Sequence, residues 1–293
     1  MNNKNLSIII VTYKSDDIIY KFIRKIPKTI KVIIVENSKN FELKKEIEKK
    51  YNNIKVYLRK NKGVSSSLNF GVTKINTEYF IHLSPDLSLD FKKIKIFFKY
   101  AKKLKNNFSA LGPRFLQTKK RGHIQINKNL KIGKIESIHG SYMFFNTKKF
   151  REIGGWDEKI FLFFEETEYC YRAKKKNLFC YQINEVKTKT IDTTVKIRDK
   201  ILRDNWQSLL RWHFIWSKFY FSKKRFGSLL SFLFFIPTIL RIFYKISLHY
   251  ILNNKTKLNK YKFRLHGLYH SVIGSKSFLR LNQIKHYSPQ TSL

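Results

Sequence analysis

Short apolar runs alternate with amphipathic stretches over the first third of the chain. Residues 6–13, 31–37, 54–59 and 79–83 are rich in β-branched and aromatic side chains. The segments between these runs carry apolar residues at helical spacing, as in 41–51. Fully apolar strands that alternate with helices are typical of a parallel sheet covered on both faces. We therefore expect an α/β fold, with a Rossmann-like, mostly parallel sheet flanked by helices.

Polar side chains follow three of these predicted strands at the point where each strand ends. Thr12 and Tyr13 end the first, Glu36 and Asn37 end the second, and Asp86 follows the fourth. Ligands bind beyond the carboxyl ends of the strands in open sheets of this type. The pattern therefore predicts a ligand site at this edge of the sheet.

The character of the chain changes after about residue 200, where it becomes aromatic, basic and helical in period. Its longest charge-free run, 226–240, has 15 residues and contains Pro237. This run is shorter than the roughly 20 residues that cross a bilayer. We expect an interfacial helix on an anionic lipid surface, or else a helical cap packed on the first domain. The expected domains are 1–200 and a helical, basic region at 201–293.

The charge of the chain is unevenly distributed. The formal net charge is +40, and no Asp or Glu occurs from Asn205 onward. This asymmetry indicates a polyanionic partner, which is nucleic acid, anionic lipid or a phosphorylated substrate; a compositional bias toward Lys, Asn and Ile explains part of it. Because no helix-turn-helix, RRM or zinc pattern is visible, we expect no nucleic-acid partner.

Cysteine usage and the N-terminus indicate the compartment. Cys170 and Cys180 match no zinc-site spacing and are expected to be buried free thiols. The short apolar run at 6–13 predicts a buried strand and not a signal peptide. A reducing, cytoplasmic setting follows as an expectation.

Acidic residues concentrate in one apolar stretch, GGWDEKIFLFFEETEYCYR at 154–172. Five of the 20 acidic residues of the chain fall between Asp157 and Glu168, among aromatic side chains. Burial raises the pKa of a carboxyl group toward the range of a general base. The alternative is a surface helix with solvated acids.

These segments together resemble glycosyltransferase family 2, in the branch similar to bacterial rhamnosyltransferases. The resemblance covers about residues 6 to 185, and its motifs occur in the family's order with similar spacing. They are IIIVTY, Glu36-Asn37-Ser38, Asn61-Lys62-Gly63 with Asn69-Phe70-Gly71, Ser84-Pro85-Asp86, and the block 154–172. The resemblance implies the GT-A fold and the binding of a nucleotide-sugar.

The resemblance also implies roles for the strand-end residues in donor binding. Glu36 looks like the acceptor for an N–H of uracil or thymine, because a carboxylate pairs well with that donor. Glycine in the 61–71 loop permits close approach of the backbone to the nucleotide. The substrate-binding residues implied in this way are Thr12, Tyr13, Glu36, Asn37, Asn61, Gly63, Asn69 and Trp156.

Asp86 is the implied ligand of a divalent cation, Mg²⁺ or Mn²⁺. One carboxylate suffices, because these ions take their other ligands from substrate phosphates and water. The alternative for Asp86 is a turn residue after Pro85. Two positions depart from the family pattern: Ser84 replaces the usual Asn, and 185–192 lacks the family's His.

In the acid block, the family's catalytic base corresponds to Glu166. The resemblance implies that Glu165 holds the acceptor or orients Glu166, and that Asp157 lies near a sugar. Glu168 and Arg172 have i, i+4 spacing and are expected to form a structural ion pair. The alternative for Trp156, besides contact with the substrate, is a core residue.

The expected function is that of a metal-dependent inverting glycosyltransferase in cell-surface polysaccharide synthesis, using dTDP-rhamnose or a UDP-sugar and a glycan or lipid-linked acceptor. We expect it on the inner face of the cell membrane. Glu stands at both Asp positions of the acid block, Glu166 and Glu168, and lengthens each side chain by one methylene. Together with the missing His, this keeps open the alternative of a catalytically silent relative that acts as an assembly subunit.

Overall fold

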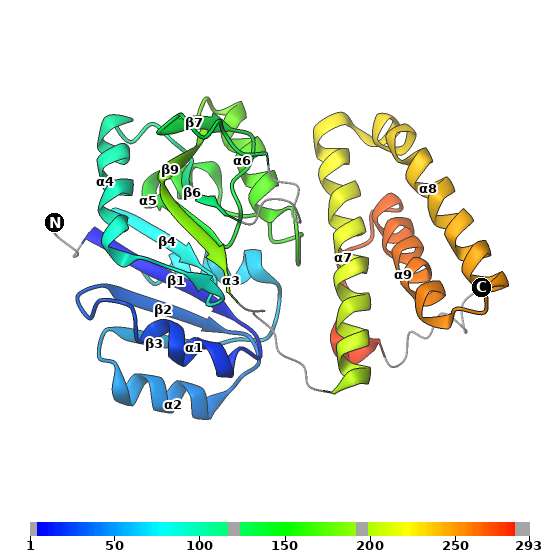
Figure 1. Ribbon diagram of the computed structural model, residues 1–293, viewed down its shortest axis with the longest axis horizontal. Coiled ribbons are helices and arrows are strands. Elements are labelled where there is room, and N and C mark those ends of the chain that lie inside the picture. Colours follow the sequence, from blue (N-terminus) through cyan, green and yellow to red (C-terminus); the bar gives the residue numbers. More distant parts are fainter. Residues whose placement is uncertain (1–4, 117–123, 192–198, 285–293) are drawn as a thin grey trace. The chain divides into compact units, whose positions relative to one another are not determined.

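A computed structural model describes residues 5–116, 124–191 and 199–284 (Figure 1). The chain divides into two compact units. The first consists of Met1–Glu158 and Glu165–Lys196, and the second of Lys159–Phe164 and Ile197–Leu293. The sequence predicted a boundary at residue 200 and did not predict that Lys159–Phe164 would leave the first unit.

The first unit is built on one sheet, which has nine strands within the described residues. Their order is β3-β2-β1-β4-β8-β6-β9-β5, and β7 pairs with β9. The strands are β1 (Leu6–Thr12), β2 (Lys31–Glu36), β3 (Ile54–Leu58), β4 (Tyr79–Leu83), β5 (Leu87–Ser88), β6 (Ala110–Phe115), β7 (Ile132–Ile135), β8 (Tyr142–Asn146) and β9 (Cys180–Thr190).

The first four strands run parallel, so their carboxyl ends lie at one edge of the sheet. β8 is antiparallel to β4, with Leu83 opposite Tyr142, and therefore begins at the edge where β4 ends. β6 is antiparallel to β8 and parallel to β9. The expected α/β fold with a mostly parallel amino-terminal sheet is confirmed.

Helices cover both faces of this sheet (Figure 1). Alternate strand residues point to opposite faces, so Ile8 and Ile10 pack into one core and Ile9 into the other. One layer contains α1 (Asp16–Ile23), α2 (Phe41–Lys50) and α4 (Ile94–Lys103), the last preceded by the short η2 (Phe91–Lys93). The other contains α3 (Val64–Val72), α5 (Thr147–Ile153) and α6 (Glu165–Lys175).

The second unit consists of α7 (Lys200–Phe226), α8 (Ser228–Ile251), α9 (Lys255–Val272) and the short η3 (Leu281–Gln283). α7 and α9 pack closely, because a Cβ at Gly267 would lie 2.6 Å from the carbonyl oxygen of Trp212. One turn further along, Ser271 Oγ donates to the carbonyl oxygen of Trp216 over 2.8 Å. Both helices therefore run in the same direction, and the predicted helical character of this region is confirmed.

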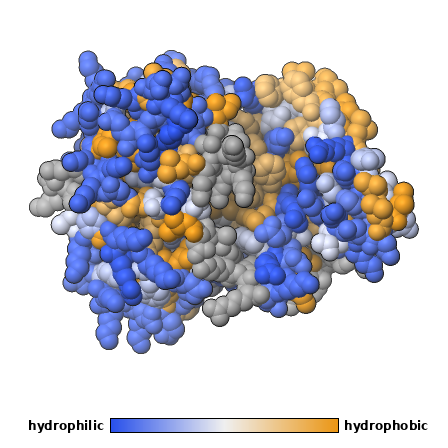
Figure 2. All heavy atoms as spheres, in the orientation of Figure 1, coloured by the Kyte–Doolittle hydropathy of each residue, from blue (hydrophilic) through white to orange (hydrophobic). Residues whose placement is uncertain are grey.

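α8 is longer and more continuous than the charge-free run suggested. It has 24 residues and passes through Pro237 without ending. Among the helices described, α8 is the one whose length and composition would allow it to cross a membrane, and 17% of its most apolar window is buried. Figure 2 shows apolar side chains gathered over this helix. The exposed ones are Leu229, Leu230, Phe232, Leu233, Phe234, Ile236, Leu240, Phe243, Tyr244, Tyr250 and Ile251.

Candidate active site

The carboxyl ends of β1 and β2 bring several predicted donor-binding residues together. Thr12 lies opposite Glu36 in the parallel ladder. The Asn37 N–H donates to the carbonyl oxygen of Thr12 over 3.0 Å, and the Arg59 N–H donates to that of Glu36 over 2.8 Å. The ladder thus continues past the strands and fixes the backbone of this edge.

Glu36 is 1% exposed and organises the turn that follows β2. Its Oε1 accepts from the Ser38 N–H over 2.8 Å and from the Ser38 hydroxyl. Its Oε2 accepts from the Asn40 N–H over 2.8 Å. Since a carboxylate oxygen has two lone pairs, Oε2 keeps one acceptor site for another donor.

Thr12 and Tyr13 each place a hydroxyl group at the end of β1. Thr12 is 2% exposed, and its Oγ1 has no hydrogen-bond partner within the described ranges. Burial and the nearby charge of Glu36 raise the pKa of the half-buried Tyr13. A buried hydroxyl without a partner costs free energy, so a ligand hydrogen bond at Thr12 would be favourable.

The loop before α3 is held by short-range hydrogen bonds. Asn61 Oδ1 accepts from the Gly63 N–H over 3.1 Å. Gly63 has a φ of 99°, which glycine adopts without strain, and α3 begins at the next residue. Ser67 Oγ donates to Asn37 Oδ1 over 2.9 Å, which ties α3 to the end of β2. Asn61, Gly63 and Asn37 thus belong to one connected region.

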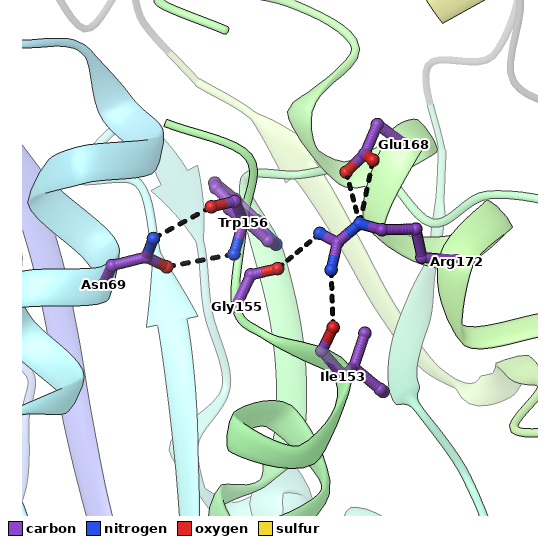
Figure 3. A network of polar contacts seen from close by, with 6 residues as sticks. All are labelled: Asn69, Ile153, Gly155, Trp156, Glu168 and Arg172. Carbon is purple, nitrogen blue, oxygen red and sulfur yellow. Dashed lines mark hydrogen bonds and ion pairs between the residues drawn. The ribbon is translucent and has the colours of Figure 1, made fainter. Parts of the chain in front are cut away.

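Asn69 lies at the other end of α3 and holds the Gly-Gly-Trp turn (Figure 3). Its Nδ2 donates to the Trp156 carbonyl oxygen over 2.8 Å, and its Oδ1 accepts from the Trp156 N–H over 3.0 Å. Gly155 has a φ of 65°, and a Cβ there would lie 2.6 Å from Asn69 Oδ1. This turn therefore requires glycine next to the amide of Asn69.

Trp156 is buried in the core, which corrects its expected contact with substrate. Its side chain is 2% exposed and packs edge-on against His82, with ring centroids 5.5 Å apart. A ring covered by protein offers no face for stacking on a sugar. The physical reason is the Asn69 clamp, which fixes the backbone of Trp156 against α3.

The predicted ion pair between Glu168 and Arg172 is confirmed. Arg172 Nε lies 2.8 Å from Glu168 Oε1, and the carboxylate is fully buried. Arg172 Nη1 donates to the carbonyl oxygen of Ile153 over 2.6 Å, and Nη2 donates to that of Gly155 (Figure 3). The guanidinium therefore fixes α6 against the end of α5 and the turn before Trp156.

Asp86 lies at the same sheet edge, beyond β4, and is 6% exposed. Its carbonyl oxygen accepts from the Ile191 N–H over 2.8 Å, next to the pairing of Leu87 with Thr190. Two residues earlier, the Ser84 N–H donates to the carbonyl oxygen of Ser141 over 2.9 Å. These bonds join the Asp86 turn to the end of β9 and to the start of β8.

Glu166 reaches this same region from the start of α6. A Cβ at Gly140 would lie 3.4 Å from Glu166 Oε2, so the carboxyl group packs on the Gly140 backbone. Gly140 directly precedes Ser141, the residue bonded to Ser84. Asp86 and Glu166 therefore lie at one edge of the first unit.

The two acids that begin α6 are desolvated. Burial raises the pKa of Glu166 to about 7. Burial, and then the charge of Glu166, raise the pKa of Glu165 well above its usual range. Glu165 Oε2 has no hydrogen-bond partner in the part of the chain that the structure describes. At neutral pH, Glu165 therefore holds a proton, and the carboxyl group of Glu166 is able to accept one.

The remaining acid of the block, Asp157, follows Trp156 directly and is partly exposed. Its expected position near a sugar stays a prediction. The turn that carries it is fixed by the contacts of Trp156 and of its neighbour Glu158, whose Oε1 accepts from Asn69 Nδ2 over 3.0 Å.

Sequence reasoning missed the segment before β8. His139 stacks on Phe115, with ring centroids 4.3 Å apart, and its Nδ1 lies 2.7 Å from Ser141 Oγ. Gly140, between His139 and Ser141, is the residue on which Glu166 packs. The signal was the His-Gly-Ser tripeptide before an apolar strand, because an antiparallel strand begins where parallel strands end.

The side chains at this edge could provide a ligand for a divalent cation, but the described residues do not form a complete set of ligands. Within residues 5–116, 124–191 and 199–284, no three His, Cys, Asp or Glu side chains converge as a ligand group. A single buried carboxylate such as Asp86 fits Mg²⁺ or Mn²⁺ that is completed by substrate phosphates. The family's His is absent from 185–192; Asp192 is an acid that could stand in its place, and it lies outside the described residues.

One cavity, of about 560 Å³, lies away from these acids. It is lined by residues at the start of β4 and the end of β8, including Glu78, Asn146 and Arg151. That is the opposite edge of the sheet from Asp86. The cavity is therefore distinct from the candidate active site.

A family profile decides the affiliation of the chain. The profile described as glycosyl transferase family 2 matches residues 7–159, just over half of the sequence. The chain belongs to this family. It is a glycosyltransferase. The match to the family profile ends before Glu165 and Glu166, so the profile does not align these two acids and only the structure gives their positions.

Other known proteins are similar to this glycosyltransferase. The low-salt glycan biosynthesis hexosyltransferase Agl10 of Haloferax volcanii is 27% identical over 220 residues, covering 65% of this chain and 69% of the relative. The mannosyltransferase PcManGT of Pyrobaculum calidifontis, solved with GDP-Man and Mn²⁺, has a TM-score of 0.57 and 10% identity, covering 92% of this chain and 87% of that one.

TarS of S. aureus is a further structural neighbour. Residues 1-349 of TarS, solved with UDP-GlcNAc, give a TM-score of 0.52 at 12% identity and 92% coverage of both chains. Against a longer TarS chain, the match covers 70% of this chain and only 39% of TarS, with a TM-score of 0.51 and 13% identity. These likenesses confirm the GT-A fold.

Proposed function

We propose that this glycosyltransferase moves a hexose, with inversion, from a nucleoside-diphosphate sugar to a hydroxyl group of a glycan or lipid-linked acceptor in cell-surface polysaccharide synthesis. The observation that carries the proposal is the desolvated acid pair at the start of α6, with Glu166 against Gly140 at the edge that also holds Asp86. The named hexosyltransferase relative and the neighbours solved with GDP-Man and UDP-GlcNAc support it.

Glu166 is the general base of this reaction. A carboxyl group with a pKa of about 7 is ionised in part at neutral pH and accepts a proton more readily than an ordinary carboxylate. It takes the proton of the acceptor hydroxyl as that oxygen attacks the anomeric carbon. The bond from this carbon to the phosphate oxygen breaks, and its electrons leave with the nucleoside diphosphate. Glu166 then returns the proton to solvent, and Glu165 and Asp157 orient the acceptor or donor sugar.

The ends of β1 and β2 hold the nucleoside. Glu36 Oε2 retains one acceptor site for an N–H of uracil or thymine, and Thr12 Oγ1 supplies an unsatisfied hydroxyl beside it. Tyr13 and Asn37 border the base and ribose, and Asn61 and Gly63 shape the neighbouring loop. Asn69, near the far end of α3, holds the Trp156 turn. This arrangement favours dTDP-rhamnose or a UDP-sugar as donor.

Asp86 would hold Mg²⁺ or Mn²⁺ through its carboxylate, which lies at the sheet edge where a diphosphate would bind. A bound divalent cation stabilises the negative charge of a departing diphosphate as a Lewis acid. The orientation of the Asp86 turn by Ile191 and Ser84 fixes that carboxylate relative to the strands.

The second unit docks on an anionic lipid surface at the inner face of the cell membrane. α8 exposes a long row of apolar side chains, with Leu229, Leu240 and Ile251 each more than 60% exposed. Lys and Arg flank it, and the chain has no acidic residue from Asn205 onward. Each basic side chain near such a surface contributes on the order of 1 kcal/mol. This region would bring the active site to a lipid-linked acceptor.

The decisive experiment is a donor screen with the purified chain, read by release of nucleoside diphosphate in the presence of Mn²⁺ or of EDTA. We expect metal-dependent release from a dTDP- or UDP-hexose, and its loss in Glu166→Gln. Glu152→Gln, on the opposite edge of the sheet, is the matched control and retains activity. Absence of release from every donor would support the silent assembly subunit instead.

Lipid docking is tested separately by co-sedimentation with vesicles. We expect binding to vesicles that contain phosphatidylglycerol and much weaker binding to neutral vesicles. Leu229→Glu and Leu240→Glu, on the exposed row, should abolish binding, whereas a glutamate at exposed Lys102 of α4 should leave it unchanged. Release of the bound protein by carbonate at high pH identifies a peripheral helix, and resistance to release would instead indicate a spanning one.

A further inference from the structure

Residues 159–164 belong to the second unit, although the residues on both sides of them belong to the first. This segment, Lys-Ile-Phe-Leu-Phe-Phe, ends at Phe164, and the next peptide bond leads to Glu165 at the start of α6. The backbone conformation of Phe164 therefore sets the direction in which the first turn of α6 begins. That turn carries both acids of the proposed active site.

The end of this segment has an unusual backbone. Phe163 has a φ of 67° and Phe164 a φ of 68°, in the left-handed region that bulky residues rarely adopt. Two consecutive phenylalanines in this conformation are strained, and such a conformation persists only where surrounding contacts hold it. The contacts that hold it come from α7.

Two aromatic side chains of α7 pack on the strained pair. Phe214 lies edge-on to Phe163 and tilted against Phe164, with ring centroids 5.6 Å apart in both cases. Phe221, two helical turns further along, stacks on Phe164 with centroids 6.0 Å apart. Each ring of the pair thus has a partner on the same helix.

The preceding residues of the segment are held by polar contacts. Ser217 Oγ donates to the carbonyl oxygen of Leu162 over 2.8 Å, and Ser217 is fully buried. His213 stacks on Phe161 with ring centroids 4.6 Å apart, and its two ring nitrogens lie 2.9 Å from Ser277 Oγ and from the Leu279 carbonyl oxygen. Burial lowers the pKa of His213 to about 3, so this ring is neutral.

Arg280 closes the other side of Phe161. Its guanidinium lies 3.7 Å from the ring centroid and donates to the carbonyl oxygens of Ser277 and Leu279. Phe161 is therefore enclosed between His213 and Arg280, and is 3% exposed. Each of the four positions 161 to 164 thus contacts a side chain of α7.

We propose that α7 is a positioning element of the active site: Phe214, Ser217 and His213 hold residues 161–164 in the strained conformation that orients Glu165 and Glu166. This inference rests on the proposed function of Glu166 as the base. None of these α7 residues touches the reacting atoms in the proposal; they act through the backbone of the segment. The helical unit then contributes to catalysis itself, besides any role on a membrane.

The test uses pairs of variants on α7 in the full-length chain. Ser217→Ala removes the bond to Leu162, and Ser208→Ala is its control, because Ser208 Oγ donates over 3.0 Å to the Asp204 carbonyl oxygen of its own helix. Phe214→Ala removes the ring from the strained pair, and Phe214→Tyr keeps it; at 43% exposure the site tolerates a hydroxyl. For each variant, kcat, the donor KM, Tm and amide hydrogen exchange of residues 160–168 are measured.

We expect Ser217→Ala and Phe214→Ala to lower kcat about tenfold with the donor KM unchanged, since small displacements of a positioned catalytic group cost up to about 10²-fold. Exchange at residues 160–168 should accelerate in these two variants. Ser208→Ala and Phe214→Tyr should match the parent chain in both measurements. Unchanged kcat and exchange in Ser217→Ala and Phe214→Ala, or equal losses in Ser208→Ala, would overturn the inference.

The outcomes separate this inference from the function on which it rests. If the parent chain transfers no sugar, or Glu166→Gln is fully active, the proposed function fails, while hydrogen exchange still reports whether α7 holds the segment. If the parent chain is active and Glu166→Gln is not, but the α7 variants leave kcat and exchange unchanged, only the positioning role fails.

Discussion

Glu36, at the end of β2, and Glu165, at the start of α6, are both buried carboxyl groups of the first unit, yet their surroundings differ. Glu36 is 1% exposed and accepts three hydrogen bonds from the turn that follows its strand. Glu165 is 9% exposed, and its Oε2 has no partner in the described parts of the chain. The neighbouring Glu166 has a pKa that burial raises to about 7.

The difference separates a binding region from a reacting one. Hydrogen bonds from Ser38 and Asn40 fix the carboxyl group of Glu36, so Glu36 is suited to hold a turn and accept from a base. In the α6 pair, desolvation outweighs the backbone hydrogen bonds and raises the pKa of both carboxyl groups, so this pair is suited to exchange protons. Each prediction below tests one side of this contrast.

The largest effect is expected from Glu166→Gln. Loss of a general base lowers kcat by about 10²- to 10⁴-fold. The folded-state pKa of Glu166 lies above its unfolded value, so the wild-type chain loses stability as the pH rises from about 4.5 to about 7. At pH 8 the variant should therefore unfold with a free energy higher by about 1 to 3 kcal/mol. Activity assays and urea denaturation of the same preparation measure the expected decrease in kcat and the expected increase in the free energy of unfolding.

Glu152→Gln serves as the control for that experiment. Glu152 is exposed, lies on α5 and not on α6, and pairs with Lys149 of its own helix. It should change neither quantity appreciably. A Glu166→Gln variant with a lower free energy of unfolding than the wild-type chain at pH 8 would contradict this prediction, because ionising a buried carboxyl group lowers the stability of the wild-type chain.

The pH dependence of kcat/KM sharpens the assignment within the pair. Because the base acts in its ionised form, kcat/KM should fall about tenfold per pH unit below a limb near 7. Glu165→Gln should keep this limb, since Glu165 is the member that stays protonated. Disappearance of the limb in Glu165→Gln, with the limb intact in Glu166→Asp, would transfer the role of base to Glu165.

Asn69→Ala tests the scaffold that supports the acid block. Its amide makes three hydrogen bonds, to the N–H and carbonyl oxygen of Trp156 and to Glu158. Their loss should lower the free energy of unfolding by about 2 to 3 kcal/mol, at about 1 kcal/mol for each bond. Denaturant unfolding measures this, with exposed Asn76→Ala as the control. An effect no larger than that of the control would mean that the turn before Trp156 holds its shape without this clamp.

Features that depend on local periodicity and strand direction were predictable from the sequence. The apolar run at 31–37 forms β2 and delivers Glu36 to the ligand edge, as the parallel pattern required. The Glu168–Arg172 pair follows from i, i+4 spacing alone. The first feature depends on the pairing of β2 with the adjacent strand, and the second on a contact within one helix.

Features that depend on distant contacts were not predictable. The Asn69 amide bonds to the backbone of Trp156, 87 positions away in the chain, and no local pattern indicates this contact. The segment 159–164 joins the second unit because α7, about fifty residues later, supplies its partners. α8 also continues through Pro237, although proline lacks a backbone donor and favours a break.

Glu36→Gln gives the smallest expected effect and decides whether this carboxylate does more than hold a turn. Its amide NH₂ would face either the Ser38 or the Asn40 N–H, leaving one backbone donor unsatisfied, at a cost of about 1 to 2 kcal/mol in the free energy of unfolding. If Glu36 also accepts from the base, the donor KM should rise for UDP- or dTDP-sugars, because the neutral amide is a weaker acceptor. A GDP-sugar presents a different edge of its base and provides the internal comparison. An unchanged KM for all donors, together with reduced stability, would assign Glu36 to the turn alone and leave Thr12, Tyr13 and Asn37 as the candidate contacts to the nucleoside.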